Sequence, residues 1–354
     1  MKSCSKSPER PRSLPIGEWP IADQRAWEDA CRPGSRFKRG GAASCLAEVS
    51  RADIANRYGA YLGFLQRTRR LDSNAPAGGQ VTLTNVVAYL ADLKTRVRSV
   101  TTWNAIYKVR RAAELVTGSK GFSWLAEIEN DLAFLMQPRS KFDRLVFTNR
   151  LLEAGLTIAT EAELFGKDEL TRARGVRNGL MVGLLAVCPI RLKNFAGLEI
   201  GRTFKEAQGR WWIALPSIST KSRRPDERRV PPVLNHMIEV YLNQSRPVLI
   251  GARPATNALW ISSQTGKVFT RKNLGTLISK VTRETIGVDV SPHLFRTAAA
   301  STAAAYGGGT PYLASAILNH YDRRVTEEDY QRASSATAAQ IFAKMVSSLV
   351  SEGL

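Results

Sequence analysis

The sequence predicts a mainly α-helical protein with one small β-sheet, divided into a helical N-terminal domain and an α+β C-terminal domain. Three observations predict this organisation. Apolar residues recur at helical spacing from residue 21 to about residue 136. Short segments rich in aromatic and branched residues, typical of strands, occur between residues 198 and 231. After them the pattern is helical again to residue 354, and no repeat of solenoid length occurs.

The first domain is predicted at residues 21–136 as a small bundle of four or five helices. Before it, residues 1–20 contain four prolines and little apolar periodicity, so we expect a disordered leader there. A proline- and glycine-containing break is expected at residues 74–79. The clearest helical patterns cover residues 46–67, 82–93 and 103–116.

The second domain is predicted at residues 149–354, after a polar, proline-containing linker at residues 137–148. Its first helices are expected at residues 151–154 and 170–185, and the apolar end of the second indicates burial. Strands are expected at residues 198–200 and 210–215, with a returning edge strand at 229–231. An amphipathic tail follows at residues 334–350, where packing on its own domain or on a second copy of the chain both remain open.

The charge of the chain favours a nucleic-acid partner over a generally basic soluble protein. The 354 residues carry a formal net charge of +20, and their 44% hydrophobic content supports real cores. Residues 1–145 carry 24 Lys and Arg against 14 Asp and Glu, and residues 146–354 carry 27 against 17. Each half is therefore basic by ten charges, which is typical of a protein that surrounds a polyanion.

The cysteines and histidines predict neither a metal nor a cofactor. No pair among the four cysteines has the C-x-x-C spacing, and the three histidines do not join them in a metal-binding pattern. Scattered cysteines of this kind fit a reducing cytoplasm. The longest apolar stretch, residues 180–190, is about half of the roughly 20 residues that a membrane span needs. The N-terminus lacks the apolar region of a signal peptide.

Six polar residues in the second domain include the kinds of group that phosphodiester cleavage requires. Such cleavage without a metal needs a nucleophile, cations around the phosphate, and groups that move protons. Guanidinium groups bind phosphate oxygens in a bidentate way, and a tyrosine hydroxyl attacks once nearby cations favour its phenolate. His and Arg in the motif His-x-x-Arg point to one face of a helix that begins at Ser291-Pro292. The six residues are Arg191, Lys221, His293, Arg296, His320 and Tyr330.

This ordered set resembles the active site of the tyrosine recombinase (phage-type integrase) family. The resemblance covers about residues 146–335, and the helical N-terminal domain resembles the family's core-binding domain in length and class only. It implies that Tyr330, ten residues after His320, is the nucleophile and that Arg191 and Arg296 hold the phosphate. Lys221 would protonate the departing 5′ oxygen, with Arg223 or Arg224 as substitutes. Phosphate contacts are expected from Arg223, Arg224, Arg228 and Arg229.

The resemblance implies a site-specific recombinase that acts on double-stranded DNA through a 3′-phosphotyrosyl intermediate and a Holliday junction. It further implies a homotetramer on synapsed sites, with no metal or other cofactor. Type IB topoisomerase activity and a DNA-binding protein without catalysis are the alternatives, whereas no RNP-like or KH-like motif indicates RNA binding. The chain departs from the family at Cys188-Pro189-Ile190, Asn194 and Asn319, which leaves its subfamily open. His236 fits no catalytic position and is interpreted as structural.

Overall fold

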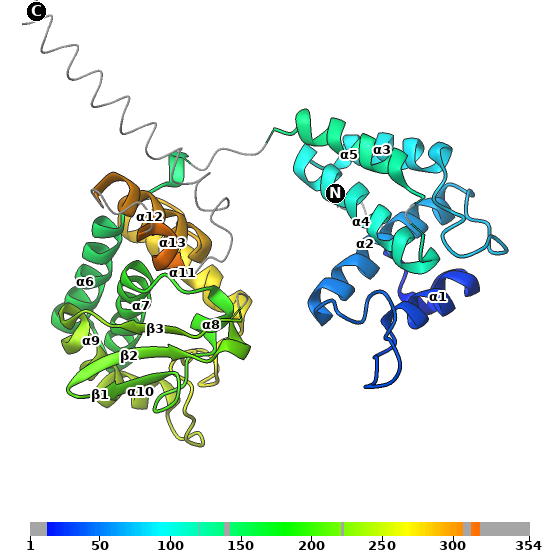
Figure 1. Ribbon diagram of the computed structural model, residues 1–354. Helices are drawn as coiled ribbons and strands as arrows, with labels where there is room; N and C mark the ends of the chain where they lie inside the picture. The colour runs from blue at the N-terminus through cyan, green and yellow to red at the C-terminus, as the bar shows by residue number, and fades with distance from the viewer. Residues whose placement is uncertain (1–12, 120, 138–141, 221–222, 307–312, 319–354) are drawn as a thin grey trace, which may run out of the picture. The chain divides into compact units, whose positions relative to one another are not determined.

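The computed structural model describes residues 13–119, 121–137, 142–220, 223–306 and 313–318 (Figure 1). The chain divides into two compact units, residues 1–140 and 141–354, and the division falls inside the segment predicted as a linker. Each unit has its own apolar core. The described residues confirm the predicted class, which is mainly helical with one small antiparallel sheet.

The described part of unit 1 contains five α-helices, in agreement with the predicted bundle. They are α1 (Ile21–Cys31), α2 (Glu48–Arg67), α3 (Leu83–Arg96), α4 (Ser99–Thr117) and α5 (Ser123–Phe134), preceded by the short 3-10 turn η1 (Ile16–Glu18). The Thr82 side chain caps α3 by accepting a hydrogen bond from the backbone N–H of Asn85 at 3.3 Å. Gly118, with φ of 65°, ends α4 in the left-handed conformation that glycine adopts readily.

Aromatic side chains form the centre of the core of unit 1. Tyr58 packs edge-on against Trp19 with ring centroids 5.1 Å apart, and Tyr61 packs edge-on against Tyr89 at 5.2 Å. The Tyr61 hydroxyl donates a hydrogen bond to the backbone carbonyl of Gln80 at 2.7 Å, so its polar end is satisfied inside the core. These contacts join α2 to α3, to the segment before α1 and to the segment before α3.

One carboxylate is completely buried in this unit. Asp23 on α1 accepts hydrogen bonds from the Tyr58 hydroxyl at 3.2 Å and from the N–H of Gly78 at 2.7 Å, both on Oδ1. Its Oδ2 atom is buried and has no hydrogen-bond partner among the residues that the structure describes. Burial raises the pKa of Asp23 above the ordinary value of 3.8, although the two hydrogen bonds lower it.

The raised pKa of Asp23 makes the stability of unit 1 depend on pH. The folded state holds the Asp23 proton more tightly than the unfolded state, so protonated Asp23 contributes to the free energy of unfolding. That contribution is fully present below pH 3.8 and is lost as pH rises through the folded pKa. The free energy of unfolding of the native chain should therefore fall with pH, and we expect Asp23→Asn to remove the part of that fall that Asp23 causes. Urea unfolding between about pH 4 and about pH 8 measures it. Asp29→Asn, at an exposed carboxylate of the same helix, is the control. If the free energy of unfolding changed equally with pH in the two variants, Asp23 would not be the group responsible.

Unit 2 is helical around one sheet. Its described α-helices are α6 (Thr148–Phe165), α7 (Glu169–Val187), α8 (Leu192–Ala196), α9 (Asn235–Val240), α10 (Arg246–Ile250), α11 (Arg271–Ile286), α12 (Pro292–Tyr306) and α13 (Leu313–Leu318). Shorter turns are η2 (Phe142–Arg144), η3 (Ser217–Ser219), η4 (Pro232–Leu234) and the π-helical η5 (Tyr241–Ser245). The prediction of a very apolar, buried end for α7 is confirmed, because residues 179–186 are all buried.

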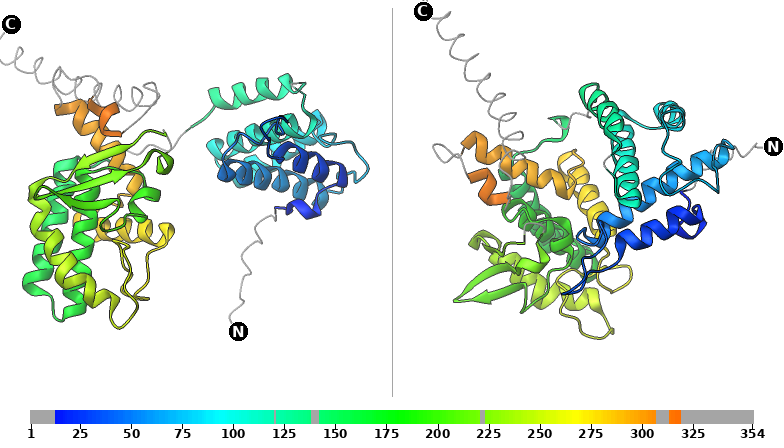
Figure 2. Two further views of the ribbon diagram at one scale, coloured as in Figure 1. Left: turned by 60° about the horizontal axis from the view of Figure 1, so that its bottom comes forward. Right: turned by 45° about the vertical axis from the view of Figure 1, so that its right-hand side comes forward.

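Helices α6 and α7 form the closest helix pair of unit 2, and both views of Figure 2 show them side by side. Glycines at the contact allow this approach. A Cβ added at Gly155 would lie 2.5 Å from the backbone nitrogen of Gly183 and 2.8 Å from the carbonyl oxygen of Gly179. Any larger side chain at position 155 would therefore separate the two helices. This pair supports the end of α7, where the chain enters the site described below.

The sheet contains three antiparallel strands in the order β1 (Phe204–Ala207), β2 (Arg210–Leu215) and β3 (Asp226–Arg229). Strand β2 has the predicted bounds. The strand predicted at residues 198–200 makes only isolated bridges, to Ala258 and to Phe204, and the first strand of the sheet lies four residues later. The return strand ends at Arg229, where a strand was expected to begin. Strand β1 pairs with β2 across the turn between Ala207 and Arg210. Its polar composition gave no strand pattern, so the sequence prediction missed it.

Candidate active site

Arg296 is a buried cation at the centre of the candidate site. It lies on the second turn of α12 with only 6% of its surface exposed. Its Nη1 donates to the carbonyl of Pro189 at 2.5 Å, and its Nη2 donates to the carbonyl of Leu318 at 2.8 Å. Burial, and then the charges of Arg191 and Arg228, lower the pKa of Arg296 to about 10, so the group stays charged at neutral pH.

Arg191 lies beside it, although the two residues are far apart in sequence. Helix α7 ends at Val187, and an extended turn through Cys188, Pro189 and Ile190 brings Arg191 to the start of α8. The residue is half-buried, and burial lowers the pKa of Arg191. Within the described part of the chain, the Arg191 guanidinium has no hydrogen bond or ion pair. Its donors are therefore available to a ligand.

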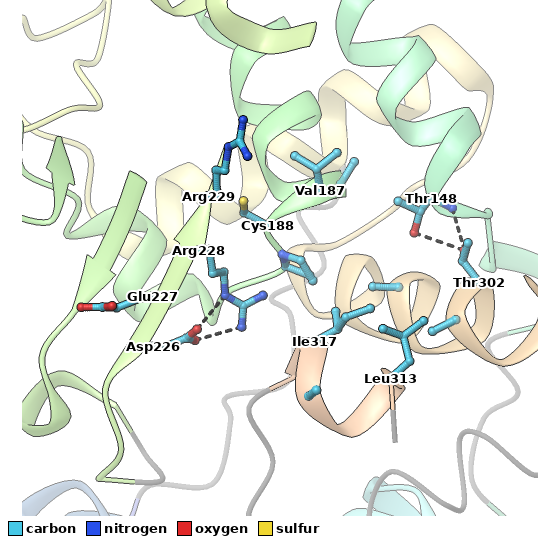
Figure 3. Close-up of a pocket in the computed structure, with 15 residues that line it drawn as sticks. Thr148, Val187, Cys188, Asp226, Glu227, Arg228, Arg229, Thr302, Leu313 and Ile317 are labelled. Carbon is cyan, nitrogen blue, oxygen red and sulfur yellow. Dashed lines mark hydrogen bonds and ion pairs between the residues drawn. The ribbon is translucent and has the colours of Figure 1, made fainter. Parts of the chain in front are cut away.

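A third guanidinium, that of Arg228, adjoins these two from strand β3. Its Nε and Nη2 donate to Oδ1 and Oδ2 of Asp226 at 2.8 and 2.9 Å, which is a bidentate ion pair (Figure 3). Residues i and i+2 of a strand share one face, so β3 presents both side chains together. Both are largely buried, with side-chain exposures of 12% and 14%.

The result is a basic cluster of Arg191, Arg228 and Arg296 around the single carboxylate of Asp226. The charge of Arg228 lowers the pKa of both Arg191 and Arg296, Arg191 also lowers that of Arg296, and the charge of Asp226 opposes the lowering at both residues. Three positive charges and one negative charge leave an excess of two among these groups. A partly buried cation excess of this kind is stabilised by an anion, and a phosphate with two guanidinium partners matches it.

A pocket with a volume of about 640 Å³ opens next to the basic cluster. The end of α7, strand β3 and helices α12 and α13 form its walls, as Figure 3 shows for Cys188, Arg228, Thr302 and Ile317. Cys188 is 1% exposed, and burial raises the pKa of its thiol to about 12. This thiol stays protonated at neutral pH, so the described residues of the pocket offer no thiolate nucleophile.

The start of α12 agrees with the sequence prediction. The helix begins at Pro292, and the backbone N–H of Leu294 donates to the Ser291 carbonyl at 2.7 Å. His293 is exposed on its first turn, three residues before the buried Arg296. The motif therefore combines a surface imidazole with a buried guanidinium at one end of one helix.

Three of the six predicted catalytic residues, Lys221, His320 and Tyr330, lie outside the described residues. The turn on both sides of Lys221 is described. The buried Thr220 donates its hydroxyl to the carbonyls of Ser217 and Arg224 at 3.0 and 2.7 Å, which fixes the two ends of this turn relative to each other. His320 follows two residues after Leu318, whose carbonyl Arg296 holds.

The four arginines predicted as phosphate contacts differ in their surroundings. Arg223, Arg224 and Arg229 are exposed, and Arg223 has a φ of 53°, the left-handed conformation of a tight turn. Arg228 differs from the expected surface contact, because its ion pair with Asp226 places it in the basic cluster. His236 lies elsewhere and contacts Glu163, with Nε2 and Oε2 3.2 Å apart, in keeping with its structural interpretation.

Sequence reasoning did not single out Asp226. The available signal was the alternation in Asp226-Glu227-Arg228-Arg229, where a strand places the first and third side chains on one face. Recognising it required the correct start of β3. In the described ranges, no group of three or more His, Cys, Asp or Glu residues gathers as a metal site. None of the described helices combines the length and the apolar character that crossing a membrane requires.

Comparison with solved structures finds a likeness at the level of the fold. No family model matches the sequence, and no curated protein matches it. The crystal structure of XerA recombinase is similar over 86% of this chain and 94% of that chain, with 15% sequence identity and a TM-score of 0.38. A likeness of this size carries no argument about function, so the function proposed below rests on the residues of this chain.

Proposed function

We propose that this protein is a site-specific DNA recombinase that breaks and rejoins strands through a 3′-phosphotyrosyl intermediate. The observation that carries the proposal is the basic cluster, in which Arg191 and Arg296 adjoin with an excess of positive charge. This excess attracts the negative charge of a phosphodiester group, and the unpaired donors of Arg191 are suited to its oxygens. The order of the remaining polar residues along the chain supplies the other groups that the reaction needs.

In the proposed reaction, the Tyr330 oxygen attacks phosphorus as the bond between phosphorus and the 5′ oxygen breaks. The tyrosine proton passes to an imidazole, for which His293 and His320 are the candidates, and Lys221 gives a proton to the departing 5′ oxygen. Arg191 and Arg296 stabilise the negative charge on the non-bridging oxygens. Fixed cations in such positions lower the activation barrier by roughly several kcal/mol.

The second half of the proposed reaction reverses the first with another strand. The 5′ hydroxyl of a partner strand attacks the phosphotyrosine, releases Tyr330 and restores a phosphodiester bond. Bond energy is conserved, so neither ATP nor a cofactor is consumed. Two rounds on paired sites pass through a Holliday junction, which requires four active sites and therefore a homotetramer on synapsed DNA.

A type IB topoisomerase is the second candidate, because it uses the same phosphotyrosine chemistry without a partner strand. The basic cluster favours both candidates equally. They differ in outcome: a topoisomerase relaxes supercoiled plasmids of any sequence, whereas a recombinase joins two DNA molecules that carry its site. A DNA-binding protein without catalysis would retard DNA in a gel and form no covalent link.

The proposal is tested by trapping the covalent intermediate without metal. Nicked duplexes that span the DNA flanking this protein's own gene are incubated with the full chain in EDTA and stopped with SDS. We expect a protein–DNA adduct, because guanidinium and ammonium groups take the place of the metal ions of two-metal nucleases. Cleavage that is lost in EDTA and restored by Mg²⁺ would refute this mechanism. Retarded DNA with no adduct would favour the DNA-binding protein without catalysis.

A further inference from the structure

A basic loop in unit 1 carries an aromatic side chain at its tip, well away in sequence from the residues of the candidate active site. Phe37 is 96% exposed. Arg36 precedes it, Lys38 and Arg39 follow it, and all three are exposed. An exposed aromatic side chain flanked by cations is typical of surfaces that bind nucleic acid, where the cations contact phosphates and the ring stacks on or between bases.

The loop holds this tip in one conformation. Ser35 and Lys38 pair across the turn, with the N–H of Ser35 donating to the Lys38 carbonyl at 2.8 Å and the reverse bond at 3.3 Å. The Ser35 hydroxyl also accepts from the N–H of Lys38 at 3.1 Å. Arg36 and Phe37 are therefore the two central residues of a tight turn, and little order has to be gained when this turn binds a partner.

The base of the loop is narrow and fixed to α1. A Cβ on Gly34 would lie 2.7 Å from the backbone nitrogen of Gly40, so the two chain segments approach as only glycine permits. Beyond them, the N–H of Gly41 donates to the Arg32 carbonyl at 3.0 Å, and that of Ala43 donates to the Ala30 carbonyl at 2.8 Å. The loop is thus a slender, anchored projection.

We propose that this loop enters the minor groove of duplex DNA, where Phe37 inserts at a base step and Arg36, Lys38 and Arg39 contact phosphates. The choice of DNA as partner rests on the proposed function. The minor groove, about 6 Å wide, excludes a helix but admits a slender turn. Two phosphate backbones border that groove, and the loop has cations on both chain sides of the aromatic ring. Apolar wedges of this kind unstack a base step and kink the duplex.

The insertion is tested with a mixed-sequence duplex that carries 2-aminopurine at several positions. Unstacking raises 2-aminopurine fluorescence, so the native chain should raise it and Phe37→Ala should not. Affinity for the duplex should fall by about 5- to 100-fold, the scale of one lost aromatic–base contact. Phe37→Leu should retain part of the signal, because leucine is also an apolar wedge. Netropsin, a minor-groove ligand, should suppress the signal.

Phe134 provides the matched control. It is 91% exposed in the same unit, and its sequence neighbours Ala133 and Leu135 are apolar rather than basic. Phe134→Ala should leave the fluorescence response unchanged. Replacing Arg36, Lys38 and Arg39 together by alanine should reduce the slope of log affinity against log salt by about 2 to 3, close to 0.9 for each lost phosphate contact.

Several outcomes would overturn the inference. Equal responses from Phe37→Ala and the native chain would exclude insertion, and an unchanged salt slope in the triple variant would exclude phosphate contacts. Loss of binding to phosphatidylserine vesicles in Phe37→Ala, with an unchanged DNA response, would assign the loop to a membrane surface. Adduct formation in EDTA reports the proposed function separately, because the fluorescence response requires no covalent chemistry.

Discussion

A Tyr330→Phe variant is expected to bind DNA with native affinity and to form no covalent adduct with it. The substitution removes only the hydroxyl oxygen, which is the atom that would bond to phosphorus. The aromatic ring and the surrounding charges are kept, so binding to the duplex should persist. Loss of the nucleophile should lower adduct formation by at least about 10³-fold. The measurement is the yield of SDS-resistant complex on the nicked duplexes described above.

Tyr321→Phe is the matched control for this variant, because Tyr321 directly follows His320 and lies nine residues before Tyr330. We expect normal adduct yield from it. Normal yield from Tyr330→Phe would reject Tyr330 as the nucleophile. Loss in Tyr321→Phe alone would transfer the role to that residue. Both positions lie outside the described residues, so the prediction rests on sequence spacing.

Lys221→Ala and Arg191→Ala should both cleave slowly, for different reasons that one substrate separates. Without its general acid, Lys221→Ala should lose roughly 10²- to 10⁴-fold in cleavage rate. A duplex with sulfur in place of the bridging 5′ oxygen should restore most of that loss, because a thiolate leaves without a proton. Arg191→Ala should not be rescued, because its defect is the loss of charge stabilisation on the non-bridging oxygens. Single-turnover cleavage rates on both substrates provide the measurement.

The same substrate identifies the acid if Lys221 does not have this role. Rescue of neither variant would make Lys221 a DNA contact only. Rescue of Arg223→Ala or Arg224→Ala would assign the acid to that residue instead. Both arginines are exposed and lie within three residues of Lys221 in the sequence.

Local chemistry in the sequence predicted several of the helices. The start of α12 at Ser291-Pro292, the cap at Thr82 and the apolar end of α7 depend on residues within one or two turns, so the sequence displays them directly. Helix α6 runs from Thr148 to Phe165, far beyond the predicted residues 151–154, because its packing against α7 stabilises turns that have weak patterns of their own.

The sheet and the basic cluster were less predictable, because they depend on contacts between distant segments. The composition of residues 198–200 resembles a strand, yet their partners are a loop at residue 258 and the start of β1. The resemblance placed Arg191 and Arg296 together on one phosphate. The addition of Arg228 and its partner Asp226 to this cluster arises only when α7, α12 and β3 pack together. A charge pattern in the sequence shows which residues can bind an anion. It does not show which of them, like Arg228, are paired with a carboxylate of the same chain.

The two backbone contacts of Arg296 have a thermodynamic consequence. The guanidinium donates to the carbonyl of Pro189, two residues before Arg191, and to the carbonyl of Leu318 at the end of α13, so one side chain contacts both segments. If a phosphate binds the basic cluster, its affinity and the attachment of α13 share one coupling free energy, so each changes the other by the same factor. Detaching α13 would therefore change DNA affinity by the same factor with which DNA changes that detachment. The end of α13 immediately precedes the segment that carries His320 and Tyr330. On the proposed function, phosphate binding would thereby be linked through Arg296 to the segment that carries Tyr330.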